Sequence, residues 1–524
     1  MTPDARGWPC PSADEMRAVD ADAIARLGIP ARTLMEAAGR AVAEAVATHY
    51  PQCRRPLVAC GPGNNGGDGY VVARLLAQQG RGVTPRVLEV SELARQSPEA
   101  KANRDLCLAA GIELRAGAGV ARAALAGCDL VVDALFGVGL SRPVTGEPAA
   151  MLTALAGAGL PIVSVDVASG ASSDTGLALG FALEPELCVA LGLPKLGQAL
   201  VAGSGRVLVA DIGLPAESVA RAGIRAHLLT RSAARALLPP RPATGHKGTF
   251  GHALVVGGSL GKTGAAILSA LGALRAGVGL LSIAAPRALV PIHAAQLAEA
   301  MCVALADAGS GEFAASHSAE IAREAAARDA LVLGPGLGQS DGAAALARAL
   351  ATGAAVPAVI DADALNAFAG ALESLRARAP RVLTPHPGEA ARLLGRDSAA
   401  IQADRAGAAR ALAAGAQAIV VLKGARTVVA SPAGELSINP TGGPGLAAGG
   451  SGDVLAGVIG ALLARGLPAW DAARLGVYLH GLAGDLGPLQ GGLASELAAR
   501  IPAAWQALAA AESPDEPGIL RPLA

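Results

Sequence analysis

Aromatic residues are scarce in this chain: Trp, Tyr and Phe make up 2% of its 524 residues, although 52% are hydrophobic. A core with so few rings must consist mainly of Ala, Val and Leu, which is typical of stacked α/β layers. An excess of either charge is also missing, since 43 basic residues balance 43 acidic ones. This balance does not favour nucleic acid or an anionic membrane as the main partner.

Cysteine pairs and apolar leader segments are missing as well. The seven cysteines are scattered, without a CxxC motif or a Cys/His cluster, so we expect reduced thiols and a cytoplasmic location. Charged residues begin at Asp4, which argues against a signal peptide. The most apolar window, residues 265–285, contains Gly277 and Gly279 and indicates a helix, a turn and a buried strand rather than a membrane span.

Short apolar runs alternate with helix-length amphipathic stretches along the whole chain, which predicts an α/β fold with parallel sheets covered on both faces. The runs in the first half are Leu57–Cys60, Val83–Val90, Leu130–Leu135, Pro161–Val167, Leu187–Leu191 and Arg206–Asp211. Those in the second half are His252–Val256, Leu280–Ala284, Asp329–Leu333, Val356–Asp361, Arg381–Thr384 and Ile419–Leu422.

A proline-rich stretch at 238–245 separates the two halves. It predicts a domain boundary near residues 224–240, and therefore two three-layer αβα domains comprising residues 1–228 and 229–524. Residues 512–524 are polar and contain proline, and we expect them to be a frayed tail.

A glycine-rich loop, Gly61–Gly69, follows the first apolar run and precedes a predicted helix, Tyr70–Gln79. Its glycines fit a GxGxxG dinucleotide fingerprint, with Glu89 at the distance of a ribose-binding acid, but that fingerprint alone is weak. The loop also presents backbone N–H groups, which suit phosphate, and side-chain oxygens, which suit a hard cation. These oxygens belong to Asn64, Asn65 and Asp68.

Two carboxylates lie at the ends of other predicted strands. Asp133 precedes the segment Phe136–Pro143, and Asp166 precedes Ala168-Ser-Gly170. A buried strand does not usually tolerate an unpaired carboxylate. Because the carboxyl ends of parallel strands gather at one edge of a sheet, the two acids together indicate a site.

The second half contains a phosphate-binding loop of its own. The segment Gly257–Thr263 is not a P-loop, because the required glycine position is occupied by Val256. The late segment Asn439–Asp453 is rich in Gly, Ala and Pro and precedes a predicted helix, Val454–Leu463. Its N–H groups can converge on an anion, and Asp453 is placed to take a proton from an attacking hydroxyl.

The first-half motifs resemble the NAD(P)H-hydrate epimerase family. They are Glu15-Met-Arg, Leu34-Met-Glu-Ala-Ala-Gly39, Gly61–Arg74, Asp133–Pro143 and Val165-Asp-Val-Ala-Ser-Gly170. The second-half motifs resemble the ribokinase-like superfamily, and within it the ATP/ADP-dependent NAD(P)H-hydrate dehydratases. They are His246-Lys-Gly-Thr-Phe-Gly251, Gly334-Pro-Gly-Leu-Gly338, Asp361-Ala-Asp-Ala-Leu365, Thr384-Pro-His-Pro-Gly-Glu389 and Val421–Thr427.

The epimerase resemblance implies a Rossmann-like domain that inverts the hydroxyl-bearing carbon of hydrated NADH or NADPH. It assigns potassium to Asn65, Asp133 and Ser169, and Asp166 is our candidate for the acid/base group. The implied contacts with the hydrated nucleotide are Asn64, Asn65, Gly66, Gly67, Asp68, Gly137, Val138, Gly139, Leu140, Ser141, Arg142, Pro143 and Asp166.

The dehydratase resemblance implies a ribokinase-like domain that dehydrates the S epimer with ADP, giving AMP and phosphate, with Mg²⁺ on the nucleotide. No residue selects ADP over ATP on physical grounds. Asp453 is the implied base. The implied contacts are Lys423, Gly424, Ala425, Arg426, Thr427 and Gly452 for ADP, and Ala265, Gly336, His386 and Asp453 for the hydrated dinucleotide. We also expect a homo-oligomer whose partners are these small molecules.

The sequence departs from the family patterns at three places. Ala168 stands where proline is usual, and Gly443 where asparagine is frequent. The strand region Cys188–Gly197 keeps Lys195 but little else of the Thr/Phe-rich pattern. These departures leave the epimerase activity and its substrate preference open.

Three other functions remain to be separated from hydrate repair. The second half could be a kinase for another small molecule, whose phosphorylated product would accumulate. The first half could be a binding module, although its Asn64–Asp68 segment and Asp133 are present. A conventional NAD oxidoreductase would use the GxGxxG glycines, but a complete phosphoryl-transfer domain follows them.

Overall fold

A computed structural model describes residues 3–80, 82–92, 96–201, 205–510 and 520–523. The chain divides into two compact units. The first consists of Met1–Asp4, Trp8–Ala226 and Pro514–Ala524, and the second of Ala5–Gly7 and His227–Ser513.

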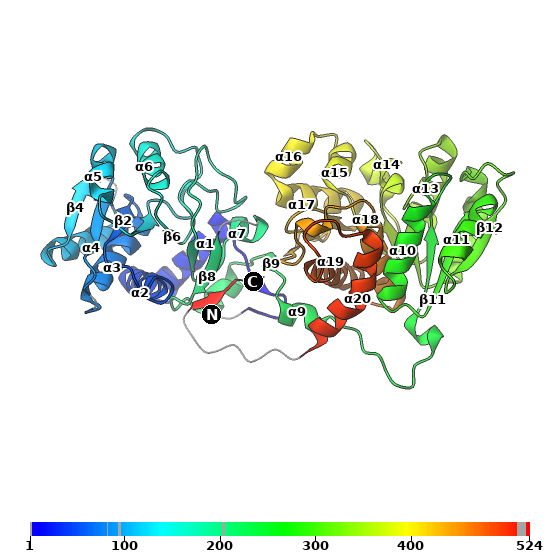
Figure 1. The fold of residues 1–524 in the computed structure, drawn as a ribbon, viewed down its shortest axis with the longest axis horizontal. Coiled ribbons are helices and arrows are strands. Elements are labelled where there is room, and N and C mark those ends of the chain that lie inside the picture. Colours follow the sequence, from blue (N-terminus) through cyan, green and yellow to red (C-terminus); the bar gives the residue numbers. More distant parts are fainter. Residues whose placement is uncertain (1–2, 81, 93–95, 202–204, 511–519, 524) are drawn as a thin grey trace. The chain divides into compact units, whose positions relative to one another are not determined.

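The first unit is built on a sheet with the strand order β19-β8-β7-β6-β5-β2-β3-β4 (Figure 1). Neighbouring strands are parallel except β19, which pairs with β8 in the antiparallel direction. The strands are β2 (Pro56–Cys60), β3 (Arg86–Glu89), β4 (Glu113–Ala116), β5 (Leu130–Ala134), β6 (Ile162–Val165), β7 (Leu187–Leu191), β8 (Arg206–Ala210) and β19 (Leu520–Pro522).

Alternate strand residues of this sheet face two different hydrophobic clusters, so helices cover both faces. Val58 and Val132 pack with α2 and α3, whereas Leu57 and Val131 pack with α5 and α6. The helices are α1 (Ala13–Ala21), the π turn η1 (Asp22–Arg26), α2 (Ala31–His49), α3 (Asn64–Gln78), α4 (Pro98–Ala109), η2 (Ala118–Val120), α5 (Ala121–Leu125), α6 (Gly146–Ala156), α7 (Leu196–Leu200) and α8 (Ala216–Arg221).

The second unit contains a larger sheet, in which the order from β9 onward is β9-β18-β17-β16-β15-β14-β13-β10-β11-β12. Its middle is parallel, while β17 pairs with β16 and β18 in the antiparallel direction. The strands are β9 (Ala226–Leu228), β10 (His252–Val256), β11 (Leu280–Pro286), β12 (Met301–Leu305), β13 (Ala330–Leu333), β14 (Ala358–Ile360), β15 (Arg381–Leu383), β16 (Ile419–Leu422), β17 (Val428–Ala430) and β18 (Leu436–Ile438).

Five helices, α9, α10, α18, α19 and α20, share one hydrophobic cluster with the sheet of the second unit, while α13 and α17 contact the sheet outside that cluster. The helices are α9 (Arg231–Ala236), α10 (Thr263–Arg275), α11 (Val290–Gln296), α12 (Ser318–Ala326), α13 (Asp341–Gly353), α14 (Asp363–Asn366), α15 (Pro387–Leu394), α16 (Ser398–Ala403), α17 (Arg405–Ala416), α18 (Ser451–Ala464), α19 (Ala469–Asp485) and α20 (Ala494–Ala509). The short 3₁₀ turns are η3 (Lys247–Phe250), η4 (Arg287–Leu289), η5 (Ala315–His317), η6 (Leu372–Leu375) and η7 (Pro444–Leu446).

In each sheet the chain changes direction beside the first central strand. β2 is followed in sequence by β3 and β4 on one side, and the chain then continues with β5 on the other side. β10 is likewise followed by β11 and β12 on one side and then by β13 on the other. Such a switch leaves a crevice beyond the carboxyl ends of the two strands, where ligands of open α/β sheets bind.

The predicted α/β class and the predicted central strands are confirmed, but some boundaries are wrong. The helix expected from Tyr70 begins at Asn64, so the polar residues of the predicted loop lie in the first turns of α3. The helix expected from Val454 begins at Ser451 and includes Asp453. Of the expected frayed tail, residues 512–519 and 524 lie outside the described residues, whereas Leu520–Pro522 form a strand.

The apolar window at 265–285 folds as most of α10, a turn and most of β11, which agrees with the predicted helix, turn and buried strand. Among the residues that the structure describes, none of the helices combines the length and the apolar character needed to cross a membrane.

Helices α10 and α18 approach so closely that glycine is required between them. A Cβ atom on Gly457 would lie 1.8 Å from the carbonyl oxygen of Ser269, and one on Gly272 would lie 2.3 Å from that of Val454. Packing of this kind fills the core without large side chains, which explains how a chain with few aromatics builds a dense interior.

We therefore expect Gly457→Ala to lower the free energy of unfolding of the second unit by roughly 1–3 kcal/mol, because the added methyl group forces α10 and α18 apart. The measurement is chemical denaturation followed by circular dichroism. Gly353→Ala is the matched control, because Gly353 also lies in a helix and its Cβ would meet nothing within 4 Å. Equal stability of the two variants would contradict the packing argument.

Candidate active sites

A cavity of about 580 Å³ lies at the switch point of the first unit. It is lined by the start of α3, the loop after β5, part of α1, and the ends of β6 and β7. The predicted residues among its lining are Asn64, Asn65, Asp68, Gly137, Val138, Gly139, Leu140, Ser141, Arg142 and Asp166. The structure thus brings together residues that are about 100 positions apart in the sequence.

The other predicted contacts of this site have packing roles. A Cβ on Gly66 would lie 1.9 Å from the Gly61 carbonyl oxygen, and one on Gly67 would lie 2.5 Å from the methyl carbon of Met35. Pro143 lies beside Gly180. The two glycines let α3 begin directly beneath the crevice.

The crevice itself depends on another glycine. Gly61 follows β2 directly, and a Cβ there would lie 1.9 Å from the carbonyl oxygen of Leu135, which follows β5. The Gly61 N–H donates to the Ala134 carbonyl at 3.0 Å. Only glycine allows the two strand ends to approach so closely.

A buried ion pair joins Asp166 to Lys195 at one side of the cavity. The Lys195 ammonium also donates to the carbonyl oxygens of Leu191 and Leu193, both at 2.9 Å. Asp166 has φ 67°, an unusual conformation for a non-glycine residue that concentrates at functional sites. This carboxylate is therefore held in one orientation by charge and by backbone.

Two further carboxyl groups line the same cavity, and their environments disfavour the charged form. Burial raises the pKa of Asp68 well above its usual value, and the nearby Asp166 and Asp20 add to the rise. Burial also raises the pKa of Asp20 to about 6, where Lys195 opposes the rise and Asp166 adds to it. Sequence reasoning missed Asp20, although it lies five residues after the motif residue Glu15.

Of the residues expected to bind potassium, Asn65 lines the cavity, whereas Asp133 and Ser169 are fully buried and do not line it. Asp133 is fully buried and accepts hydrogen bonds from the Ser164 hydroxyl and the Ser169 N–H, both at 2.8 Å. Within the described ranges no basic residue pairs with Asp133, and burial raises its pKa. The Asn65 side-chain amide is also buried, and its nitrogen has no hydrogen-bond partner in the part of the chain that is described.

Glu89 does not serve as a ribose ligand. It is buried, and its carboxylate accepts the Tyr70 hydroxyl at 2.9 Å and the Arg104 guanidinium at 2.6 and 2.8 Å. Its partners are therefore the neighbouring helices α3 and α4. This geometry argues against the dinucleotide oxidoreductase reading of the GxGxxG motif.

The second unit has a cavity of about 480 Å³ at its own switch point. Ala265, Gly336 and Asp453, all predicted, line it together with Lys262 and Asp363. The loop after β10 is tied to the loop after β13, since the Ser259 N–H donates to the Gly336 carbonyl at 2.8 Å. A Cβ on Gly257 would lie 2.1 Å from the Pro335 carbonyl oxygen, so glycine is again required at the crevice.

Asp453 lies in the first turn of α18, next to Gly449 and Gly450 in the cavity wall. No side chain caps this helix start. The Ser451 N–H donates to the Ala448 carbonyl, which leaves the N–H groups of Gly452 and Asp453 without a partner among the described residues and open to an anion. Burial raises the pKa of Asp453 to about 7; Asp361 adds to the rise and Lys423 opposes it. The carboxyl group is thus poised to change protonation near neutrality.

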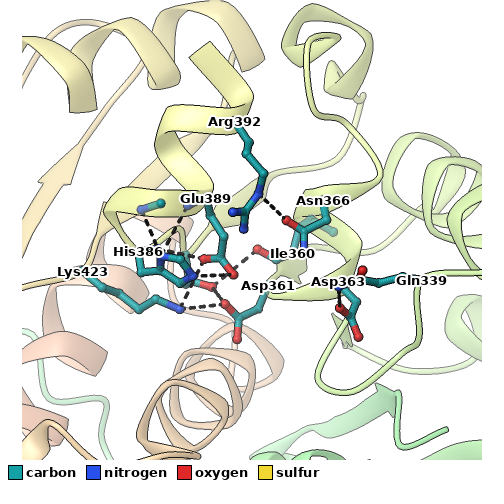
Figure 2. Close-up of polar contacts among 11 residues, drawn as sticks. Gln339, Ile360, Asp361, Asp363, Asn366, His386, Glu389, Arg392 and Lys423 are labelled. Carbon is teal, nitrogen blue, oxygen red and sulfur yellow. Dashed lines mark hydrogen bonds and ion pairs between the residues drawn. The ribbon is translucent and has the colours of Figure 1, made fainter. Parts of the chain in front are cut away.

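A polar cluster beside this cavity is centred on Lys423 (Figure 2). Its ammonium group donates to Asp361 at 3.0 Å and lies 3.9 Å from the Glu389 carboxylate. Burial acts to lower the pKa of Lys423, but Asp361 and Glu389 outweigh it and the pKa is raised. A Cβ on Gly452 would lie 3.2 Å from the Lys423 nitrogen, so the positive charge reaches the start of α18.

The remaining predicted residues lie around this cluster rather than in the cavity. His386 caps α15: its Nδ1 accepts the N–H groups of Gly388 and Glu389 at 3.0 and 3.3 Å, and half of its side chain is exposed. Residues 424–427 form the turn after β16, where Arg426 has φ 54° and the Thr427 hydroxyl donates to the Gly424 carbonyl at 2.9 Å.

Sequence reasoning assigned no role to Asp361, Asp363 or Lys262. Asp363 accepts the Lys262 ammonium at 2.9 Å and the Gly338 N–H at 3.0 Å, and it thereby joins three loops at the mouth of the cavity. Ala362, between the two aspartates, has φ 48°, a strained conformation that turns both carboxylates toward the site. The sequence contained a signal for these two aspartates, because the motif Asp361-Ala-Asp lies at the carboxyl end of a predicted strand, where site residues are expected.

Two family models match the chain. Residues 31–197 match the model described as YjeF-related protein N-terminus, and residues 253–505 match the model described as NAD(P)H-hydrate dehydratase. The first match includes the potassium candidates and Lys195, and the second ends well after Asp453. The second cavity lies wholly within a matched region, and the first lies within one except for its wall from residues 16–24 and Ile212.

Proteins similar to this chain over most of its length carry both units. The bifunctional NAD(P)H-hydrate repair enzyme of Moorella thermoacetica is 42% identical, with 90% of this chain and 91% of that protein covered. Its counterpart from Escherichia coli is 36% identical, with 90% and 88% covered. A solved ADP/ATP-dependent NAD(P)H-hydrate dehydratase from Bacillus subtilis, co-crystallised with ATP and Mg²⁺, is 33% identical, with 54% of this chain and 98% of that chain covered and a TM-score of 0.46. The chain belongs to the family of bifunctional NAD(P)H-hydrate repair enzymes.

Proposed function

We propose that residues 1–228 interconvert the R and S epimers of hydrated NADH and NADPH, and that residues 229–524 dehydrate the S epimer at the expense of ADP. One observation carries this division of labour. Each unit places predicted site residues at its own switch-point cavity. Each site also combines an Asp–Lys ion pair, which lines the first cavity and lies beside the second, with a second aspartate of raised pKa in the cavity lining.

Dehydration begins with phosphoryl transfer. Asp453 takes the proton of the ring hydroxyl, and the oxygen forms a bond to the terminal phosphorus of ADP while the bond to AMP breaks. The C–O bond of the phosphorylated ring then breaks. Inorganic phosphate leaves with the electrons of that bond, and the neighbouring carbon gives its proton to solvent water as the C=C bond of dihydronicotinamide forms. The helix N-terminus of α18 and Lys423 stabilise the transferring phosphoryl group electrostatically.

Lys423, residues 424–427 and Gly452 are the proposed ADP contacts, and Ala265, Gly336, His386 and Asp453 the proposed dinucleotide contacts. Mg²⁺ commonly binds through one or two carboxylates and the substrate phosphates. Asp363 lines the cavity but is already paired with Lys262, and the described residues contain no group of three His, Cys, Asp or Glu arranged to hold a metal ion. Mg²⁺ would therefore be held mainly by the phosphates of ADP.

The residues around Asp133 fit a monovalent cation. A fully buried carboxylate with no basic partner among the described residues is costly, and a cation would compensate it. Asn65 supplies an amide whose oxygen and nitrogen ends are interchangeable by rotation, and Ser169 supplies a hydroxyl. Potassium bound here would hold the Phe136–Pro143 loop against the cavity.

A cytoplasmic location agrees with the cysteines, all seven of which are free. A homo-oligomeric state remains a prediction, to be measured by light scattering on the purified chain.

Hydrated NADH offered as a mixture of epimers tests the proposal directly. With ADP present, the full chain is expected to restore dihydronicotinamide absorbance until both epimers are consumed. With the Asp166→Asn variant, the recovery of absorbance should stop once the S epimer is exhausted, because the variant no longer converts R to S. Only slow spontaneous epimerisation would then continue. If a phosphorylated product accumulated instead, the second unit would be a kinase of another kind.

Asp453→Asn should lower dehydration by roughly 10²–10⁴-fold and leave epimerisation intact, since the base and the epimerase cavity lie in different units. In the unmodified chain the rate of dehydration should rise as pH increases through about 7, because a base acts only in its ionised form. Steady-state rates at several pH values measure both effects. Substantial turnover by the variant would remove Asp453 from the mechanism.

The cation assignment is tested by Asp133→Ala. The variant should lose the potassium dependence of epimerisation and convert R more slowly, because the site loses its charged ligand. Epimerisation rates are compared across potassium concentrations with sodium as the balancing ion, and ADP-driven dehydration of pure S epimer serves as the internal control. Epimerisation that ignores both potassium and the substitution would contradict the assignment.

A further inference from the structure

Helix α1 contributes one wall of the epimerase cavity. Met16, Arg17, Asp20 and Ile24 all line it, at the three- and four-residue spacing that places side chains on one helical face. After Asp20 the helix continues as the π turn η1, a geometry frequent at functional sites.

The start of α1 is fixed relative to the residues that hold the Asp166–Lys195 pair. The N–H of Leu196, next to Lys195, donates to the Pro11 carbonyl at 3.0 Å. The N–H of Ala13 donates to the Asp174 carboxylate at 2.7 Å, which joins α1 to the loop that follows β6. Asp20 is therefore carried by a rigid element into the charged side of the cavity.

In the Asp166–Lys195 ion pair, one oxygen of the Asp166 carboxylate has no partner among the described residues. All three ammonium hydrogens of Lys195 have acceptors, namely Asp166 and the carbonyl oxygens of Leu191 and Leu193. Asp166 receives Lys195 and the Leu191 N–H on the same oxygen, Oδ1. No hydrogen bond to Oδ2 comes from the described residues, so Lys195 acts as a fixed counter-ion and Oδ2 is available to a ligand.

The Asp20 carboxyl, unlike that of Asp166, is not held by hydrogen bonds from the described residues. Burial raises its pKa to about 6; Lys195 opposes this rise and Asp166 adds to it. Two acids held in such different surroundings within one cavity are suited to separate proton-transfer roles.

We infer that Asp20 is a catalytic residue of the epimerase unit: its carboxyl donates the proton to the departing ring hydroxyl, and Asp166 accepts the proton of the water that adds back. The inference rests on the proposed epimerase function and extends it to a residue of α1.

The step balances in atoms and electrons. The O–H bond formed with the Asp20 proton turns the hydroxyl into water, the C–O bond breaks, and the lone pair of the ring nitrogen forms the C=N bond of an iminium ion. Water then adds to the other face of this carbon, the C=N electrons return to nitrogen, and Asp166 Oδ2 takes the released proton. Exchange with solvent water reprotonates Asp20 and deprotonates Asp166.

The experiment uses the full chain without ADP, so that the second unit is idle, and follows conversion of R-hydrated NADH to S by chromatography. Asp20→Asn should lower kcat roughly 10²–10⁴-fold with little change in KM. Asp20→Glu should recover part of the rate because it restores a carboxyl. Asp105→Asn is the matched control: the same change at an exposed helical residue, in α4, that does not line the cavity.

The pH profile separates a proton donor from a structural residue. A general acid works only when protonated, so the unmodified rate should fall as pH rises through about 6. The other charged groups facing Asp20 across the cavity are Arg17, Asp68, Glu99, Arg142, Asp166 and Lys195. In the pH–rate profile, Asp20→Asn should abolish the fall near pH 6, whereas Asp20→Glu should keep it. Thermal unfolding checks that each variant remains folded.

Two results would overturn the inference: an unchanged rate for Asp20→Asn, or a slow variant that keeps the falling limb near pH 6 and is not improved by Glu. Failure of the unmodified chain to interconvert the epimers would instead refute the proposed function on which the inference rests.

Discussion

The close approach of two strand ends at a glycine is the contact on which both active sites depend. Gly61 after β2 meets the Leu135 carbonyl after β5, and Gly257 after β10 meets the Pro335 carbonyl after β13. In both units the contact lies where the chain changes direction in the sheet. A side chain at either position would separate the two loops that form the cavity, so the absence of a Cβ atom is as important there as any catalytic group.

The two sites also use the same electrostatic arrangement. A lysine pairs with one aspartate, Lys195 with Asp166 and Lys423 with Asp361. A second aspartate lies within the influence of that pair and has a pKa near neutrality, because burial opposes its charge. Chemistry at a ring hydroxyl requires a proton donor or acceptor near neutral pH, and this arrangement supplies one in each unit.

The sites are held by strained backbone as well as by charge. Asp166 and Ala362 both have positive φ values, and they lie one and two residues after strands β6 and β14, respectively. Conformations of this kind persist only where the surrounding structure fixes them. In the first unit Lys195 provides that support, and in the second the bonds of Asp363 to Gly338 and Lys262 do so.

The sequence by itself determined the class of fold and part of the lining of each cavity, because apolar periodicity marks parallel strands and ligand-binding residues follow their carboxyl ends. It placed Asp133, Asp166 and Asp453 correctly at element ends. It missed the strands β4, β9, β12, β17, β18 and β19, which are three to five residues long and lie at or near the ends of the two sheets.

Only the tertiary structure decided which acids act together. Asp20 is 146 residues from Asp166 in the sequence, and no local pattern distinguishes it from the exposed Asp14 on the same helix. Its proximity to Lys195 and its burial exist only after α1 is tied to the Pro11–Leu196 contact. Composition and spacing therefore specify where a site forms, whereas the protonation behaviour of its residues depends on burial and on charges brought close by folding.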